Sequence, residues 1–123
     1  MAEFTVELVA VDRKLWSGQA TMVTAETTDG ELGVLPGHQP LLGELLDNGV
    51  VTITGSNGER VVFGVQGGFL SVSKEKVTVL ADWAITSDEL DSSVIEEYEV
   101  SDDEYVRAHG TTARRAQRRM EMI

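Results

Sequence analysis

The sequence lacks several residue types on which catalytic and metal sites depend. Its 123 residues include no cysteine and only two histidines. The absence of cysteine excludes a disulfide framework, a thiol nucleophile and a thiolate metal site. Neither histidine lies in a metal-ligand spacing, and the sequence has no Gly-x-Ser-x-Gly elbow and no glycine-rich phosphate loop. We therefore expect a protein with no active site, no metal and no cofactor.

The sequence is also poor in long apolar runs. The best stretch, residues 61–65, has the length of a strand, whereas a helix that spans a bilayer needs about 18 to 20 apolar residues. The N-terminus carries no basic and apolar leader, which favours a cytoplasmic location. The net charge of −11 would repel nucleic acids and anionic lipids. We expect no nucleic-acid partner, and membrane association only through another protein.

Alternating apolar residues near the N-terminus predict a β-strand with one buried face. Phe4, Val6, Leu8 and Ala10 would lie on that face. Turn residues then separate several more short β-rich runs, with no helical pattern between them, which predicts an antiparallel sandwich or barrel over about the first 85 residues. These runs lie at residues 21–27, 50–54, 60–65, 69–72 and 76–80.

The pattern changes after residue 85. Residues 86–89 have the Thr-x-x-Glu spacing of a capping box, and apolar residues follow at helical intervals. A helix should therefore begin near Ser87. The same spacing recurs at residues 101–104, where this helix should break, and Gly110 should precede a short second helix over residues 113–123. The prediction is a helical hairpin.

Two blocks of sequence resemble the epsilon subunit of bacterial F-type ATP synthases. The first is GELGVLPGHQPLL at residues 30–42, and the second is GGFLSV at residues 67–72 followed by VTVLADWA at residues 77–84. The resemblance covers about residues 4–91. The short tail is similar to actinobacterial members because it is dense in arginine.

The resemblance implies a fold and a role. The fold is mainly β with an α tail: an antiparallel β-sandwich of about ten short strands over residues 1–86, then a two-helix regulatory tail over residues 87–123. In this family the sandwich docks on the gamma subunit and the c-ring, and it couples ring rotation to the alpha/beta catalytic head without doing chemistry. A peripheral position on the cytoplasmic face of the bacterial cell membrane follows.

The resemblance also implies roles for individual residues. Glu31 and His38 fall on the loop that faces the c-ring. The alternative for Glu31 is a solvated turn residue, and His38 could equally be a structural residue that is hydrogen-bonded inside the loop. Trp83 would lie at the gamma interface or be buried within the sandwich. Leu41 and Leu42 are expected to anchor the core.

The tail carries two segments of opposite charge. Residues 88–104 contain nine carboxylates and no basic residue, whereas residues 107–119 contain five arginines and no carboxylate. In the family, basic residues of the tail reach acidic segments of the catalytic head and block ATP hydrolysis. The alternative is that the arginines pair with the acidic helix and close the hairpin. The candidates are Arg114, Arg115, Arg118 and Arg119.

Some family members bind ATP through an (Ile/Leu)-Asp-x-x-Arg-Ala motif in the first tail helix. Only Leu90 and Asp91 match here, because Val94 and Ile95 replace the arginine and alanine. The cation that would meet phosphate is absent, which argues against nucleotide binding.

A competing function also fits the residues. A free-standing β-sandwich module that binds a small ligand, with a helical tail, would have the same pattern. An enzyme would require turnover from His38, which has no evident catalytic partner in the sequence.

Overall fold

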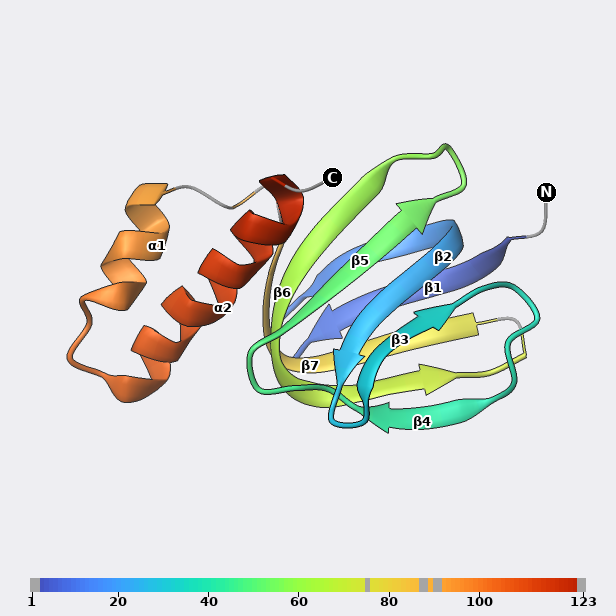
Figure 1. The fold of residues 1–123 in the computed structure, drawn as a ribbon, viewed down its shortest axis with the longest axis horizontal. Coiled ribbons are helices and arrows are strands. Elements are labelled where there is room, and N and C mark those ends of the chain that lie inside the picture. The colour runs from blue at the N-terminus through green and yellow to red at the C-terminus, as the bar shows by residue number, and fades with distance from the viewer. Residues whose placement is uncertain (1–2, 75, 87–88, 90–91, 122–123) are drawn as a thin grey trace.

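The structure is a computed structural model that describes residues 3–74, 76–86, 89 and 92–121. A β-rich body occupies one side of the molecule and a pair of helices the other (Figure 1). The strands are β1 (Phe4–Ala10), β2 (Lys14–Thr27), β3 (Gly30–Val34), β4 (Leu41–Glu44), β5 (Gly49–Gly55), β6 (Arg60–Val72) and β7 (Lys76–Thr86). The helices are α1 (Ser92–Glu99) and α2 (Glu104–Glu121). The predicted fold class, mainly β with a helical tail, is confirmed.

The sheet closes on itself. The hydrogen-bonded order is β1-β7-β6-β5-β2, and β2 pairs again with β1, while β3 and β4 extend the sheet from β2 and β6. Every pair is antiparallel except β1 with β7, which are parallel. A closed ring of five strands cannot alternate in direction all the way round, so one neighbouring pair must be parallel. The antiparallel prediction was wrong for that pair.

The described residues contain seven strands, fewer than the ten or so short ones expected. The difference arises because runs predicted as separate strands are continuous, as in β6, which joins residues 60–65 to residues 69–72. Gly67 and Gly68 lie between them with φ of 63° and 107°. A Cβ on Gly68 would stand 1.8 Å from the carbonyl oxygen of Leu80, so only glycine fits this bend. The first half of β6 therefore pairs with β5 and the second half with β4.

The core is built from the predicted alternation. Phe4, Val6, Leu8 and Ala10 are all buried and their neighbours along β1 are not. They pack with buried side chains from the other strands, of which Phe63 is the largest. Burial of such a side chain contributes about 1.5–3 kcal/mol, so this cluster supplies the main driving force for folding.

Among the described residues, the first helix of the tail is α1, Ser92–Glu99. Residues 87 and 88, where the start was predicted, lie outside the described residues. The carboxylate half of the predicted capping box is present, because Glu89 Oε1 accepts a hydrogen bond of 3.2 Å from the backbone N–H of Thr86. Leu90 and Asp91 also lie outside the described residues.

The second helix is longer than predicted. The break at residues 100–103 is confirmed, and Asp103 Oδ1 caps α2 by accepting hydrogen bonds from the N–H groups of Tyr105 (2.9 Å) and Val106 (3.4 Å). The prediction that Gly110 precedes the helix was wrong, because α2 runs through it. A Cβ on Gly110 would lie 2.9 Å from the backbone nitrogen of Glu99. This glycine therefore permits the close approach of the two helices.

Neither helix of the described residues is long and apolar enough to cross a membrane.

Candidate functional site

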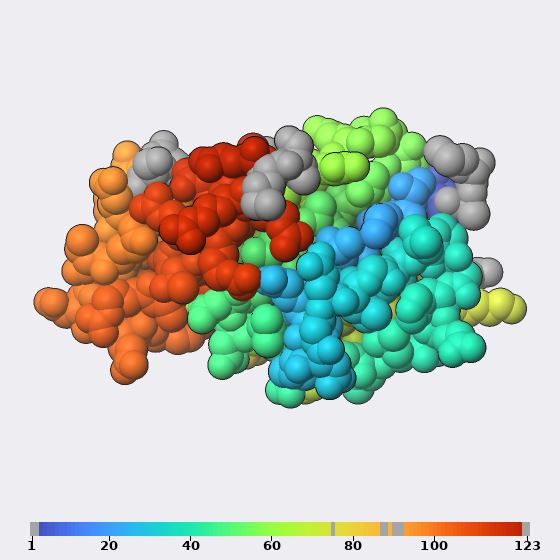
Figure 2. Space-filling view, viewed as in Figure 1, coloured from blue at the N-terminus to red at the C-terminus, as the bar shows by residue number. Residues whose placement is uncertain are grey.

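The joint between the tail and the sandwich is the first candidate site. Helix α2 lies between the sandwich and α1, and it packs on β5 and β6 (Figures 1 and 2). Small residues allow the close contact: a Cβ on Gly64 of β6 would stand 3.3 Å from the Cβ of Ala116. Ala116 is buried with Val50 and Val62, and Ala113 with Ile85 and Ile95. Trp83 and Tyr98 also pack against the second of these clusters.

Arg115 makes the main polar contact of this joint. Its guanidinium donates to both carboxylate oxygens of Glu26 on β2, at 2.9 and 3.0 Å, and also to the carbonyl oxygen of Asn48. The Glu26 side chain is only 15% exposed, and it also accepts the N–H of Val50 at 2.8 Å. A bidentate pair of this kind is among the stronger polar contacts in proteins. It fixes α2 to β2 and to the turn before β5.

The other three arginines were predicted to meet the catalytic head or the acidic helix. In this conformation Arg114 pairs with Glu99 of the acidic segment at 2.8 Å, and its hydrogen bond lowers the pKa of that carboxyl. Arg119 lies 3.5 Å from Glu31 on β3. Arg118 makes no ion pair within the part of the chain that the structure describes.

Sequence reasoning missed the pairing of arginines with the sandwich. It proposed the acidic segment at residues 88–104 as the intramolecular partner, whereas Arg115 and Arg119 reach carboxylates more than eighty positions away. No pattern near Glu26 marks it as a partner, because its position depends on how β2 and β3 pair.

A further ion pair joins Arg13 to Glu89, which lies between β7 and α1 in the sequence. Arg13, in the turn after β1, donates to both oxygens of Glu89 at 2.7 and 2.8 Å and to the carbonyl oxygen of Ala84 at 3.1 Å. The hydrogen bond from Arg13 lowers the pKa of Glu89 against an opposing effect of burial. The sequence contained no signal for this pair.

An aromatic cluster joins the sandwich to both helices. Trp83 on β7 stacks on His109 of α2, with ring centroids 3.9 Å apart and an angle of 5° between the planes. Tyr98 of α1 and Tyr105 of α2 meet the imidazole edge to face at 5.5 and 4.7 Å. In this conformation, Trp83 therefore contacts the tail. The spacing of Tyr105 and His109, four residues apart on one helix, is the signal that could have revealed half of the cluster.

The predicted ring-facing loop lies on the sandwich. Glu31 is exposed at the start of β3 and meets Arg119. His38 is hydrogen-bonded inside the loop: its Nδ1 lies 2.7 Å from the carbonyl oxygen of Gln39, and its backbone N–H donates to the carbonyl oxygen of Leu35 at 3.1 Å. Leu41 packs against the core as predicted, but Leu42 is 71% exposed, so that prediction was wrong.

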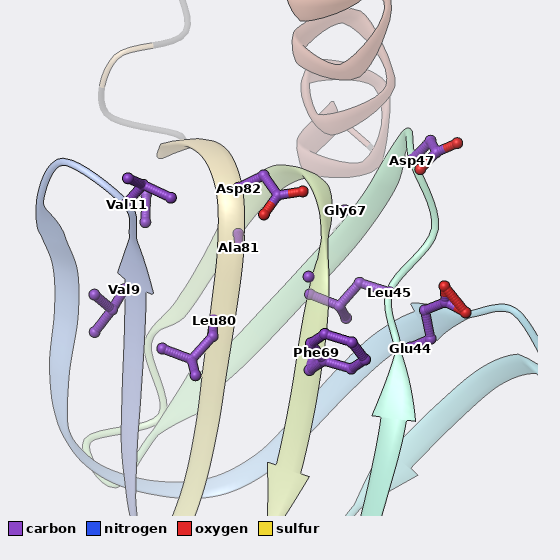
Figure 3. A pocket seen from close by; sticks show the side chains of 12 residues that line it. Val9, Val11, Glu44, Leu45, Asp47, Gly67, Phe69, Leu80, Ala81 and Asp82 are labelled. Carbon is purple, nitrogen blue, oxygen red and sulfur yellow. The ribbon is translucent and has the colours of Figure 1, made fainter.

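An exposed apolar surface on the sandwich is the second candidate site. Val9, Val11, Phe69 and Leu80 line an open cavity of about 390 Å³ between β1, β7 and β6 (Figure 3). Val11 is 84% exposed, and Phe69 and Leu80 are each 51% exposed. The carboxylates of Glu44, Asp47 and Asp82 lie around them. Contiguous exposed apolar groups of this kind mark protein–protein contacts.

The fold and these surfaces define a class of protein: a small β-sandwich with an exposed apolar face and a helical hairpin clamped to it by ion pairs. Residues 3–87 match the family model described as the β-sandwich domain of the ATP synthase delta/epsilon chain. The chain belongs to this family, as its sequence blocks predicted.

Relatives and solved structures agree with that assignment. The ATP synthase epsilon chain of Corynebacterium efficiens is 61% identical over 119 residues, which cover 97% of this chain and 96% of the relative. That of Rhodococcus opacus is 59% identical over 91 residues, or 74% and 75% of the two chains. A chain of the mitochondrial ATP synthase of Euglena gracilis, solved with F1 and the c-ring, matches with a TM-score of 0.68 and 25% identity, covering 99% of this chain and 81% of that one.

Proposed function

We propose that this chain is a non-catalytic central-stalk subunit of a proton-driven ATP synthase that couples rotation of the c-ring to the catalytic head. The observation that carries the proposal is the match over nearly the whole chain to relatives named ATP synthase epsilon chain. The partners would be the gamma subunit, the c-ring and the alpha and beta subunits. The chain would lie at the cytoplasmic face of the cell membrane and be held there by the complex.

Two surfaces of the sandwich, residues 1–86, would contact the gamma subunit and the c-ring. The apolar surface formed by Val9, Val11, Phe69 and Leu80 suits the gamma subunit, because its burial would remove exposed apolar area from water. Glu31, at the start of β3, and His38, in the loop that follows this strand, would face the c-ring. Release of the tail would expose the face of Trp83 on which His109 now stacks.

The tail, residues 87–123, would inhibit ATP hydrolysis when it leaves the sandwich and enters the catalytic head. Three of its four candidate arginines are paired with carboxylates of this chain in the docked state. Release would expose them to acidic segments of the head, so one set of ion pairs would replace another. A two-state element of this kind is biased by small free-energy differences.

A reversible tether tests the inhibitory role. The chain has no cysteine, so Glu31→Cys with Arg119→Cys creates a single pair at contacting side chains. The pair would be joined by a cleavable bismaleimide, and hydrolysis would be measured with the catalytic head and gamma. Tethering should raise hydrolysis several-fold, and cleavage of the tether should restore inhibition.

The two single-cysteine variants, treated with the same reagent, are the matched controls. If the tether leaves hydrolysis unchanged while the chain still binds gamma, the tail does not inhibit and serves coupling alone. If the untethered chain does not bind gamma, the docking proposal fails.

A further inference from the structure

We propose that the aromatic cluster of Trp83, Tyr98, Tyr105 and His109 is a proton-sensitive latch, which holds the tail on the sandwich while His109 is neutral and weakens when its ring gains a proton. The latch itself is a property of the isolated chain. Its effect on ATP hydrolysis rests on the proposed inhibitory function of the tail.

The position of His109 makes it suitable as a latch. It is only 8% exposed, and its ring meets side chains from three elements: Trp83 from β7, Tyr98 from α1 and Tyr105 from α2. Trp83 and Tyr98 also meet each other edge to face at 5.9 Å. A change of charge on the imidazole therefore acts at once on its ring contacts with Trp83, Tyr98 and Tyr105.

The surroundings of the ring favour its neutral form. The Nε2 atom of His109 is buried and has no hydrogen-bond partner among the described residues. A neutral imidazole can leave this nitrogen as an unprotonated acceptor, whereas the imidazolium must carry an N–H on it. An unpartnered N–H on a charged, buried ring is unfavourable. Burial accordingly lowers the pKa of His109, and the negative charge of Asp103 opposes this effect.

Among the described residues, the charges near the cluster do not supply a direct partner for the imidazolium. On α2, the carboxylate of Asp103 is bound to the N–H groups that begin the helix. On α1, Glu99 is paired with Arg114. On β7, Asp82 lies over Gly67 and shares a cavity of about 260 Å³ with Tyr105. The face of Trp83 would attract a cation, which offsets part of the cost of protonation.

The direction of the pH effect follows from these contacts. In the released tail His109 should have the usual pKa of about 6.5, and in the docked tail a lower one. Between the two values the docked state binds fewer protons. Docking is therefore strongest above about pH 6.5. As the pH falls below this value, the equilibrium constant for docking decreases, by at most about tenfold per pH unit when one proton is involved. In the complex, acidification would increase inhibition of hydrolysis.

The test measures docking in the isolated full chain. Spin labels at Ser56→Cys and Glu97→Cys, two exposed positions on the sandwich and on α1, report the docked fraction as a distance distribution. Between pH 7.5 and 5.5 the docked fraction should fall in the otherwise unchanged chain. His109→Phe keeps an aromatic ring without a proton site, so its docked fraction should stay constant.

Tyr105→Phe is the matched control, because it changes the same cluster but keeps the histidine, and it should retain the pH dependence. The proposal is overturned if the unchanged chain keeps its docked fraction at pH 5.5, or if His109→Phe loses docking with the same pH profile. If His109→Phe cannot dock at any pH, NMR titration of His109 decides. A pKa in the docked chain equal to or above that in a peptide of residues 87–123 would then refute the latch.

Hydrolysis by the complex separates the latch from the proposed function. With both proposals correct, the ratio of inhibition at pH 6 to that at pH 8 should be several-fold larger for the unchanged chain than for His109→Phe. If the isolated chain shows the latch but these ratios are equal, the latch stands and the inhibitory role of the tail fails.

Discussion

Arg115 illustrates how a single side chain joins two parts of the molecule. Replacement by alanine would leave the mostly buried carboxylate of Glu26 without its bidentate partner. We expect Arg115→Ala to lower the free energy of unfolding by about 1–3 kcal/mol, because a buried charge keeps its desolvation cost when its partner is lost. Urea denaturation of the full chain measures this change.

Arg118→Ala is the control for that prediction. Arg118 makes no ion pair among the described residues, so its removal should change stability by less than about 0.5 kcal/mol. Equal effects of the two substitutions would mean that the contact with Glu26 does not stabilise the chain.

Gly68 is a second residue on which the fold depends. A methyl group there would meet the carbonyl oxygen of Leu80 at 1.8 Å, and the φ of 107° is itself unfavourable for alanine. We expect Gly68→Ala to destabilise the chain by about 3 kcal/mol or more, since backbone must move to make room. Thermal unfolding followed by circular dichroism would measure the loss.

Gly58→Ala separates the two causes. Gly58 also has a positive φ, of 86°, but nothing lies within 4 Å of an added Cβ. The loss of stability caused by Gly58→Ala should be limited to backbone strain of about 1–2 kcal/mol. If Gly68→Ala cost no more than Gly58→Ala, the bend in β6 would not require a glycine for steric reasons.

At the scale of elements, the crossing of α1 and α2 depends on Gly110. Alanine in a helix interior is favoured over glycine by about 1 kcal/mol, yet here its methyl group would lie 2.7 Å from Cγ and 2.9 Å from the nitrogen of Glu99. We therefore expect Gly110→Ala to increase helicity in a peptide of residues 101–123 but to weaken packing of the tail in the full chain. Circular dichroism of the peptide and spin-label distances in the chain measure the two effects.

An increase in both helicity and docking would show that the helices have room to separate without loss of stability.

Gly110 also explains why the boundaries of α2 were mispredicted. Glycine usually ends a helix, and only the approach of α1 gives it a different role here.

At the scale of the whole molecule, the exposed apolar surface is expected to decide assembly. Leu80→Glu should weaken binding to gamma in the catalytic head by at least about tenfold, because it places a charge at the centre of the surface. Stability should change little, since Leu80 is already 51% exposed. Surface plasmon resonance with immobilised head and gamma would measure the affinity.

Val100→Glu is the matched control. Val100 is 79% exposed, like the apolar residues of this surface, but it lies in the loop that connects α1 to α2. It should bind gamma as the unchanged chain does. If Leu80→Glu binds normally, gamma contacts another face of the sandwich.

The sequence by itself determined the local features of this protein. Alternation at Phe4, Val6 and Leu8 identified a strand and its buried face, and the capping residues near Asp103 located the break between the helices, because both patterns depend on neighbours in the chain. The blocks at residues 30–42 and 77–84 identified the family for the same reason, since they are continuous.

The tertiary structure alone decided which distant residues meet. The pairing of Arg115 with Glu26, the stacking of Trp83 on His109, the parallel contact of β1 with β7 and the exposed surface around Leu80 all depend on how the sheet closes. No local pattern encodes them, because each joins residues far apart in the sequence whose distance is set by packing of the whole chain.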